Sequence, residues 1–341
     1  MKLYFRGHDY KYAAEQMLLM LFPGQRPEYP DTPPEEGENA LTLTLSRGAL
    51  WATAGAKLTW EGRTYRGAAR CPDPEGLDEV AKNRALQHAL KQAFYKAGVQ
   101  ALGRQPAWGA LTGVRPVKLP TRAMEGGMTA AQAKKQLEQT YHVSPRRAEL
   151  AVTCAKASLT VKKRLEQHHF SLYAGIPFCP SRCAYCSFIS ADVKGCLKLV
   201  EPYLDALERE TMYCADLARQ AGQRVRSIYI GGGTPTTLEP EQLRRVMAAI
   251  RTGFDLNECL EYTVEAGRPD TITPEKLAVI REMGGDRVSV NPQSMRDSVL
   301  RAMGRAHTAA DIVSAYELVR KADFHAVNMD LIAGLPGDDP E

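Results

Sequence analysis

The hydrophobic pattern of the first hundred residues predicts a small α/β module. Leucines at positions 41, 43 and 45 alternate with threonines, as in a strand that buries one face. Residues 12–21 and 78–97 place apolar side chains at helical spacing, and Gly98 is expected to end the second helix. Three further short strands complete a module that we place at residues 1–105: residues 2–6, 51–53 and 64–68.

The next segment, residues 106–168, is predicted to be a mostly helical connector. Gly126-Gly127 and Ser144-Pro145 interrupt its helical pattern. Its pairs of basic residues stand beside glutamates, which indicates a solvated helix face and not a nucleic-acid surface. We interpret residues 108–116 as a packed turn at the domain junction and assign them no chemical role.

After Phe170, short apolar runs alternate with helical patterns, and we place a third domain at residues 169–341. Such an alternation predicts a parallel α/β sheet with helical crossovers, either an open sheet or part of a (βα) barrel. In both architectures ligands bind at the carboxyl ends of the strands. Five strands are expected: residues 171–176, 225–230, 262–265, 287–290 and 326–332.

The sequence ends at Glu341, soon after the fifth predicted strand. A barrel that stops there leaves its last strand as an exposed edge, unless something outside this sequence covers it. We therefore expect a fragment, in which a partial (βα) barrel truncated after its fifth strand follows the small α/β module and the helical connector.

Composition and charge argue against a nucleic-acid-binding, a membrane or a secreted protein. The 44 lysines and arginines against 40 aspartates and glutamates leave a net charge of +4, which is too small to predict a nucleic-acid partner or an anionic membrane. The apolar runs are short and interrupted by charged residues, so no membrane span is expected. Arg6, His8 and Asp9 stand where a signal peptide needs its apolar stretch. We expect a cytoplasmic protein.

Three cysteines close together carry the clearest chemical signal. Cys179, Cys183 and Cys186 lie on one predicted loop, where their thiolates can converge on one inorganic centre, either zinc or an iron–sulfur cluster. A structural zinc site usually needs a fourth protein ligand, for which His169 and Cys196 are the nearest candidates. Buried structural cysteines are the remaining alternative. The other five cysteines are solitary and are expected in core or inert positions.

The spacing Cys-x3-Cys-x2-Cys, with an aromatic residue before the third cysteine, resembles the cluster loop of radical S-adenosylmethionine (SAM) enzymes. The resemblance implies that the three cysteines hold a [4Fe–4S] cluster whose fourth iron has no protein ligand and binds the amino and carboxylate groups of SAM. It also implies that an electron from the cluster cleaves SAM to methionine and a 5′-deoxyadenosyl radical. The cofactor then supplies the difficult chemistry.

A glycine run follows the next predicted strand: Gly231, Gly232 and Gly233, before Thr234. Backbone without side chains can approach a ligand closely, and its N–H groups can bind the methionine moiety of SAM. Taken alone, the run is also compatible with an ordinary tight turn. Its place after a strand, beside the cysteine loop, favours a SAM site.

Polar residues also mark the ends of the later strands. Glu265 ends the strand at 262–265, where an acid suits a pair of ribose hydroxyls; a surface salt bridge is the alternative. Gln293 follows the strand at 287–290. Asp330 falls inside an otherwise apolar strand, where an unpaired carboxylate costs free energy, so we expect it to have a polar partner.

Taken in order, these motifs resemble those of the oxygen-independent coproporphyrinogen III oxidase (dehydrogenase) family. The matching segments are Tyr-x5-Cys at Tyr173, Gly-Gly-Gly-Thr-Pro-Thr, Asn-Pro-Gln at Gln293, Gly-Arg at Arg305 and Asn-x-Asp-Leu-Ile-x-Gly-Leu-Pro-Gly at Asp330. Residues 108–116 and 264–273 are most similar to the HemZ branch of that family. The resemblance covers nearly the whole chain and is most specific over residues 171–337.

Carried over by motif, the family resemblance implies a SAM site with assigned contacts. The SAM carboxylate would be contacted by Tyr173 and Arg305, and the ribose by Glu265. The nucleoside would be held by Gln293, Asp330 and Ile332. The glycine run together with Thr234, as further cofactor contacts, and the three cysteines complete the set. No catalytic side chain is assigned.

The same resemblance implies a reaction and its partners. Members of the family oxidatively decarboxylate the propionates of coproporphyrinogen III to vinyl groups, with electrons from a donor such as flavodoxin or ferredoxin. The oxidases have a further cysteine two positions after the third cluster cysteine, where this chain has Phe188. The related haem chaperones also lack that cysteine. Binding or delivery of haem on the same scaffold is therefore the alternative function, and a zinc-stabilised α/β protein without catalysis is a third.

Overall fold

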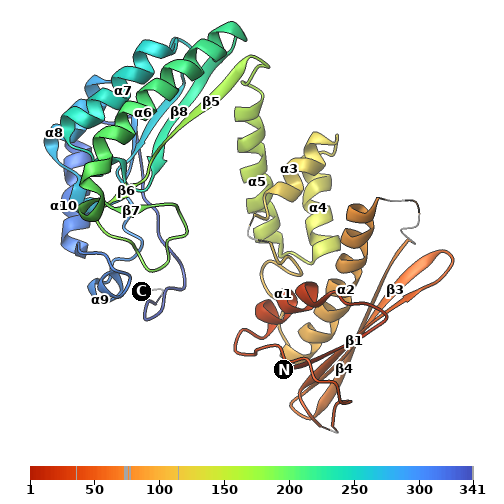
Figure 1. The fold of residues 1–341 in the computed structure, drawn as a ribbon. Coiled ribbons are helices and arrows are strands. Elements are labelled where there is room, and N and C mark those ends of the chain that lie inside the picture. Colours follow the sequence, from red (N-terminus) through yellow and green to blue (C-terminus); the bar gives the residue numbers. More distant parts are fainter. Residues whose placement is uncertain (36, 73–75, 77, 114, 340–341) are drawn as a thin grey trace. The chain divides into compact units, whose positions relative to one another are not determined.

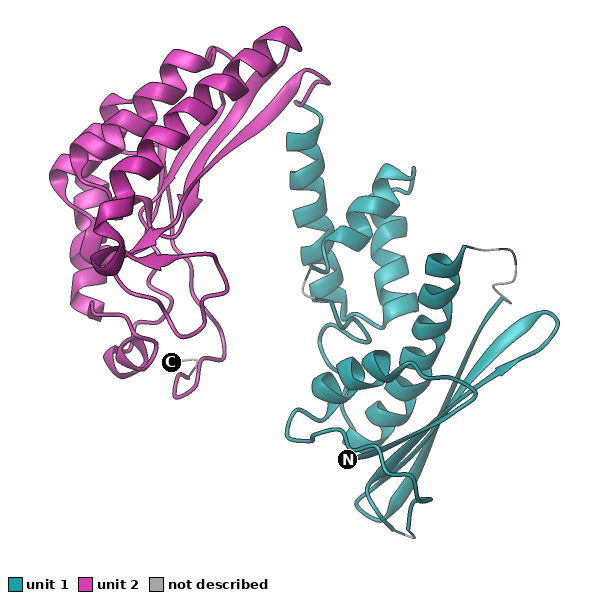
Figure 2. Cartoon of the chain, viewed as in Figure 1, with its two compact units in different colours: residues 1–164 teal, residues 165–341 magenta. Residues whose placement is uncertain are grey.

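Figure 1 shows the fold in a computed structural model, which describes residues 1–341 except 36, 73–75, 77, 114 and 340–341. The chain divides into two compact units, Met1–Arg164 (unit 1) and Leu165–Glu341 (unit 2), coloured separately in Figure 2. Each unit has its own sheet and its own large hydrophobic core. The packing of each unit is therefore explained by its own residues.

Unit 1 is built on a sheet with the strand order β1-β2-β3-β4. The first pair is parallel and the others are antiparallel. β3 and β4 are longer than the short runs that we predicted, because a two-residue turn at Glu61-Gly62, where both residues have positive φ, continues their ladder. The strands are β1 (Lys2–Arg6), β2 (Ala40–Arg47), β3 (Trp51–Trp60) and β4 (Arg63–Pro72).

Two helices, α1 (Lys11–Leu21) and α2 (Glu79–Leu102), pack with this sheet around the core of unit 1. The prediction that Gly98 ends the second helix is wrong, because α2 continues to Leu102 and the left-handed Gly103 caps it. A Cβ at Gly98 would lie 2.6 Å from Cδ1 of Leu21. The absence of a side chain at Gly98 thus leaves room for the Leu21 side chain between the two helices.

The rest of unit 1 consists of three helices, α3 (Lys118–Glu125), α4 (Ala130–Tyr141) and α5 (Pro145–Lys162), which share a small core of their own. Gly109 has a positive φ, and a Cβ there would overlap the backbone at the end of α4. The backbone N–H of Ala110 donates to the carbonyl of Tyr141 at 2.7 Å. The beginning of the segment 108–116 is thus a turn packed against α4, and residue 114 lies outside the described part.

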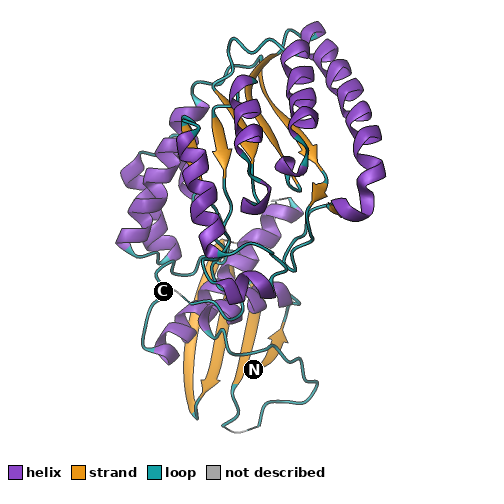
Figure 3. Cartoon of the chain, turned by 90° about the vertical axis from the view of Figure 1, so that its left-hand side faces the viewer, coloured by secondary structure: helices purple, strands orange, loops and turns teal. Residues whose placement is uncertain are grey.

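Unit 2 contains a parallel sheet in the order β11-β10-β9-β8-β5, so that neighbouring strands are consecutive and are joined by helices. Helices α6, α7, α8 and α10 lie along one face of this sheet (Figures 1 and 3). The strands are β5 (His169–Ile176), β8 (Arg224–Gly232), β9 (Glu261–Glu265), β10 (Arg287–Ser289) and β11 (Ala326–Asn328). The helices are α6 (Val193–Gln220), α7 (Pro240–Gly253), α8 (Pro274–Glu282), α9 (Asp297–Ala302) and α10 (Ala309–Lys321).

The two faces of this sheet differ in polarity. Side chains that face the helices are apolar and buried, such as Ile228, Val264 and Val288. Alternate positions carry polar side chains that bond across the strands, and Ser289 donates to Asn328 at 2.8 Å. Because the pleat alternates, this polar face continues at the carboxyl ends of the strands into the residues discussed below.

The fifth strand is shorter than predicted, since β11 ends at Asn328 and not at residue 332. Asp330 therefore lies beyond the strand, with an exposed side chain, and it is not buried in an apolar environment. No hydrogen bond or ion pair to its carboxylate is found among the described residues, so the polar partner that we expected is not observed. An exposed carboxylate is solvated by water and does not require such a partner.

Within the described residues, no helix combines the length and the apolar character that crossing a membrane requires.

Candidate cluster and cofactor site

The cysteine loop leaves the carboxyl end of β5 and returns to the start of α6. A pair of two-residue strands, β6 (Phe178–Cys179) and β7 (Ala191–Asp192), closes its base. At its far end, the N–H of Ala184 donates to the carbonyl of Met303 at 3.0 Å. The loop is therefore held at both ends by hydrogen bonds from this chain alone.

A pocket in unit 2 joins this loop to the carboxyl ends of β8, β9 and β10. It is lined by Cys179, Ser181, Cys183, Tyr185, Cys186, Phe188, Ser190, Gly232, Gly233, Thr234, Glu265, Gly267, Arg268, Asn291, Gln293 and Arg305. All three cysteines and most of the other predicted site residues thus surround one space. The remaining four are outside the lining: Tyr173, Gly231, Asp330 and Ile332.

Cys179 is the most buried of the three cysteines. Burial raises the pKa of Cys179, the hydrogen bond from Thr234 acts in the opposite direction, and the neighbouring Cys186 and Cys183 raise it further. The hydroxyl of Thr234 donates to the Cys179 sulfur at 3.5 Å. Metal binding would remove the cost of thiolate formation, because a positive centre stabilises the deprotonated ligands.

The three cysteine sulfurs are not gathered as closely as the ligands of a single zinc ion are. Among the described residues, only His168, His169 and Glu258 bring three potential ligand atoms within 4.8 Å of one another. The three cysteine sulfurs are therefore more widely spaced. A tetrahedral zinc site with Zn–S bonds of about 2.3 Å would hold its sulfurs about 3.8 Å apart.

The histidine suggested as a fourth zinc ligand serves another purpose. Nδ1 of His169 accepts the backbone N–H of Glu166 at 2.9 Å, and its Nε2 lies 2.8 Å from a carboxylate oxygen of Glu258. Because Nδ1 is an acceptor, Nε2 carries the proton and donates to Glu258. His169 is satisfied at the start of β5, at the opposite end of that strand from the cysteine loop.

The glycine run lies against the base of the cysteine loop. The N–H of Gly233 donates to the carbonyl of Ile176 at 2.7 Å, and the N–H of Thr234 donates to that of Phe178 at 2.8 Å. A Cβ at Gly233 would lie 2.7 Å from the Phe178 oxygen and 2.9 Å from the sulfur of Cys179. The run consists of glycines because β8 and the cysteine loop approach each other so closely here.

This arrangement changes what the glycine run can offer to SAM. The N–H groups of Gly233 and Thr234 are already used within the chain, so they are not free for the methionine moiety as we expected. No hydrogen bond to the Gly233 carbonyl is found in the described part of the chain, and Gly233 lines the pocket. The backbone here offers an acceptor, which suits an ammonium group.

Gln293 adopts an unusual backbone conformation at the pocket. Its φ of 72° lies in the left-handed region, which costs a non-glycine residue about 1–2 kcal/mol. Its N–H donates to the carbonyl of Asp330 at 2.9 Å, and its carbonyl accepts the N–H of Ile332 at 3.0 Å. These bonds fix Asp330 beside the pocket, whereas the Ile332 side chain packs on a small core that includes Val299.

Glu265 is the acidic group of the pocket. The amide of Asn291 donates to its Oε1 at 3.1 Å. Burial, reinforced by the charge of Asp330, raises the pKa of Glu265, although hydrogen bonds from Tyr229 and Asn291 act in the opposite direction. Gly231 is a glycine partly because a Cβ there would lie 2.9 Å from Oε2 of Glu265. Two carboxyl groups, at positions 265 and 330, are thus available to hydroxyl donors.

The pKa of Glu265 gives a test of both stability and binding. Because the native pKa is raised, the charged carboxylate destabilises the fold increasingly as pH rises from about 4.3 through the native pKa. Glu265→Gln should therefore raise the melting temperature at pH 8 and have little effect near pH 4. The same variant should weaken SAM binding to the reconstituted protein about tenfold, since it loses a charged acceptor.

The exposed Glu282 provides a matched control for this test. Its pKa is lowered by the hydrogen bond from Arg244, so Glu282→Gln should give no stability gain at pH 8 and should leave SAM binding unchanged. A stability difference between wild type and Glu265→Gln that does not vary with pH would show that the carboxylate bears no burial cost.

Arg305 is a buried cation beside the cysteine loop, with 5% of its surface exposed. Its Nη1 donates to the carbonyl of Asn291 at 2.7 Å, and its Nε donates to the hydroxyl of Tyr185 at 3.2 Å. Burial raises the pKa of Tyr185 to about 12, although Arg305 acts in the opposite direction. No carboxylate pairs with Arg305 among the described residues, so its charge is available to an anionic group in the pocket.

Tyr173 lies on β5 outside the pocket lining, with 58% of its surface exposed. Its ring stacks on that of Tyr229, with ring centres 5.8 Å apart. Tyr229 connects it to the pocket, because Tyr229 lies close enough to Glu265 to lower the pKa of that carboxyl group.

Several pocket residues were missed by the sequence analysis. Asn291 and Arg268 belong to motifs that we noted, the Asn-Pro-Gln and 264–273 segments, but nothing in those segments marks them as polar groups that turn inward. Arg268 is 3% exposed and donates to the cysteine loop. One signal in the sequence could have identified Arg268. Shortly after the strand that ends at Glu265, Pro269 has a basic residue before it and an acidic residue, Asp270, after it.

Residues 173–341 match the model of the radical SAM superfamily. The chain belongs to this superfamily. Its cofactors are a [4Fe–4S] cluster and SAM, and the parallel sheet of unit 2 is part of a radical SAM barrel.

Curated relatives of this radical SAM chain carry two kinds of name. It is 38% identical over 234 residues to the oxygen-independent coproporphyrinogen-III oxidase-like protein HemZ of Bacillus subtilis, an alignment that covers 68% of this chain and 47% of HemZ. It is 37% identical to the heme chaperone HemW of Bacillus subtilis, which covers 49% of this chain and 43% of HemW. It is 34% identical to the oxygen-independent coproporphyrinogen III oxidase of Escherichia coli, in an alignment that covers 54% of this chain and 40% of that oxidase. The chain spans less than half the length of these relatives.

Proposed function

We propose that this chain binds a [4Fe–4S] cluster through Cys179, Cys183 and Cys186 and uses SAM in the oxidative decarboxylation of the propionates of coproporphyrinogen III. The observation that carries the proposal is the single pocket in which the three thiols meet Gly233 and Glu265. When bound, the cluster and SAM supply a radical that takes hydrogen from an unactivated carbon. An electron donor such as flavodoxin or ferredoxin would reduce the cluster.

The residues of the pocket match the functional groups of SAM. The carbonyl of Gly233, which accepts no hydrogen bond from any described residue, suits the ammonium group, and the buried guanidinium of Arg305 suits the carboxylate. Glu265 and Asp330 provide acceptors for the ribose hydroxyls; burial and the nearby charge of Asp330 both raise the pKa of Glu265, which indicates that the two carboxyl groups lie near each other. Gln293 sets the backbone that places Asp330 there. In this proposal Tyr173 acts through Tyr229, and Ile332 supports the backbone by packing.

Delivery or binding of haem is the alternative, and Phe188 favours it. Phe188 lines the pocket and is 63% exposed, and its neighbour Ile189 is 95% exposed. An exposed aromatic ring can stack on a flat macrocycle, but it offers no proton, thiolate or metal ligand. The similarity to HemW supports the same alternative.

Anaerobic turnover separates the two functions. The chain is reconstituted with iron and sulfide, reduced, and assayed for 5′-deoxyadenosine and protoporphyrinogen with and without coproporphyrinogen III; haem is titrated in parallel. The oxidase function predicts substrate-dependent loss of carbon dioxide, which Phe188→Cys should accelerate. Tight haem binding without decarboxylation by either protein would exclude the oxidase function and support the alternative.

A further inference from the structure

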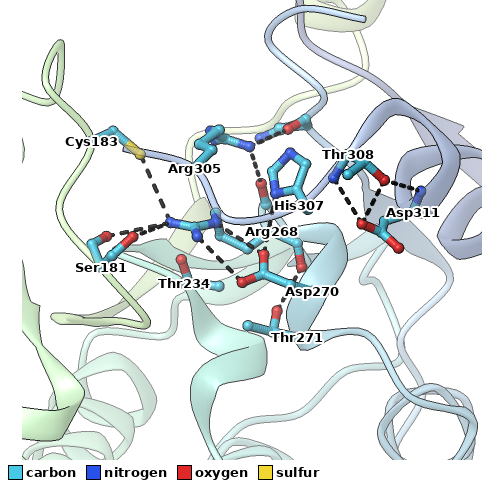
Figure 4. Close-up of polar contacts among 12 residues, drawn as sticks. Ser181, Cys183, Thr234, Arg268, Asp270, Thr271, Arg305, His307, Thr308 and Asp311 are labelled. Carbon is cyan, nitrogen blue, oxygen red and sulfur yellow. Dashed lines mark hydrogen bonds and ion pairs between the residues drawn. The ribbon is translucent and has the colours of Figure 1, made fainter. Parts of the chain in front are cut away.

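The segment after β9 contains an ion pair between a buried arginine and a partly exposed aspartate, which neither the cofactor contacts nor the proposed reaction uses. Arg268 is 3% exposed, and it binds both oxygens of Asp270: Nε to Oδ1 at 3.1 Å and Nη2 to Oδ2 at 3.3 Å. Nδ1 of His307, whose side chain is fully buried, lies 3.3 Å from Oδ1 of the same carboxylate (Figure 4). The carboxylate is therefore held from two sides.

The carboxylate of this pair stays ionised. Burial alone would raise the pKa of Asp270, but the hydrogen bond from His307 and the charge of Arg268 lower it to about 2. The guanidinium is a permanent cation, and its partner keeps it in one orientation. With Nε and Nη2 occupied by Asp270, Nη1 is left to point at the cysteine loop.

That third nitrogen contacts the cysteine loop at two residues. Nη1 donates to the hydroxyl of Ser181 at 3.1 Å and lies 3.9 Å from the sulfur of Cys183 (Figure 4). The Ser181 hydroxyl in turn donates to the carbonyl of Gly304 at 2.9 Å. Arg268 therefore bridges the end of β9 and the middle of the loop that carries the cysteines.

We propose that Arg268, oriented by Asp270, is a positioning residue that orders the cysteine loop before the cluster is assembled and stabilises the reduced cluster through a hydrogen bond to the Cys183 thiolate. The inference rests on the cluster ligation in the proposed function. Reduction adds one negative charge to a centre that its thiolates already make anionic. A donor from a buried cation favours the reduced form, so it raises the reduction potential. Asp270 lies on the far side of the guanidinium and opposes this effect more weakly.

Two variants test the proposal because they should act in opposite directions. Arg268→Gln removes the cation and should make the midpoint potential of the reconstituted cluster more negative, measured by a redox titration followed by EPR. Asp270→Asn removes the opposing negative charge and should make it less negative. Arg268→Lys keeps the charge without the two-pronged contact and should fall between wild type and Arg268→Gln.

Loop order supplies a readout that needs no cluster. In the apoprotein, hydrogen exchange of the loop amides between Cys179 and Phe188 should be several-fold faster in Arg268→Gln than in wild type. The control is Arg287→Gln, which breaks a more exposed pair with Glu261 elsewhere in the same unit and should change neither the loop nor the potential.

Equal potentials in wild type and Arg268→Gln, at equal iron content, would overturn the electrostatic role, and so would shifts of Arg268→Gln and Asp270→Asn in the same direction. Unchanged loop exchange would overturn the ordering role. A wild-type chain that takes up no iron would instead contradict the proposed function, and the apoprotein comparison would still decide whether Arg268 orders the loop.

Discussion

Replacing Cys183 by alanine is expected to abolish both the brown iron–sulfur absorption of the reconstituted protein and all cleavage of SAM. The same result is expected for Cys179→Ala and Cys186→Ala, because two thiolates do not hold a four-iron cluster whose fourth iron has no protein ligand. The loss should be complete, since the three sulfurs line one pocket and no other cysteine among the described residues lines it.

Two cysteines outside the pocket are the controls for this experiment. Cys259 donates to the carbonyl of Glu261 at the start of β9, and Cys214 is exposed on α6. Alanine at either position should leave the iron and sulfide content per chain unchanged. A Cys183→Ala protein that retains four irons per chain would show that the ligands have been assigned wrongly.

The second large effect is expected at Gly233, where the available space is determined by backbone atoms. Gly233→Ala would place a Cβ less than 3.0 Å from the carbonyl oxygens of Ile176 and Phe178 and from the sulfur of Cys179. Two of these atoms are backbone oxygens, which cannot move without the chain, so the base of the cysteine loop must shift. We expect a loss of stability of about 1–3 kcal/mol and a cluster content well below that of wild type.

Gly195→Ala is the matched control for Gly233→Ala. Gly195 lies in the first turn of α6 with an ordinary φ, and a Cβ there meets no atom within 4 Å. It should therefore keep the stability and the cluster content of wild type. Full cluster occupancy in Gly233→Ala, measured as iron and sulfide per chain, would show that the glycine run is not needed for the close approach of β8 and the loop.

The sequence predicts the strands of unit 2 well because each is a short apolar run between helices of clear periodicity. Its errors come from effects that act through space. Gly98 looks like a helix end, but it is a contact with Leu21, more than seventy residues earlier in the chain. Asp330 looks like part of a strand, but the ladder ends two residues before it.

In the candidate site, too, some residues are predictable from the sequence, whereas the roles of others depend on contacts between distant segments. The cysteines, Glu265 and Gln293 are predictable because they stand at fixed spacings or directly after strands. The roles of the glycine N–H groups are not, since their partners at residues 176 and 178 are known only once β8 and β5 are paired. Arg268 was missed for a related reason: a charged residue is usually exposed, and only the position of Asp270 and the loop explains its burial.

The measurement that tests the account most directly is the EPR spectrum of the reduced, reconstituted chain before and after SAM is added. With three cysteine ligands, one iron is open to the amino and carboxylate groups of SAM, so we predict that SAM changes the spectrum and that Cys183→Ala gives no cluster signal to change. A four-iron cluster whose spectrum is the same with and without saturating SAM would contradict the account, as would a chain that binds zinc and takes up no iron.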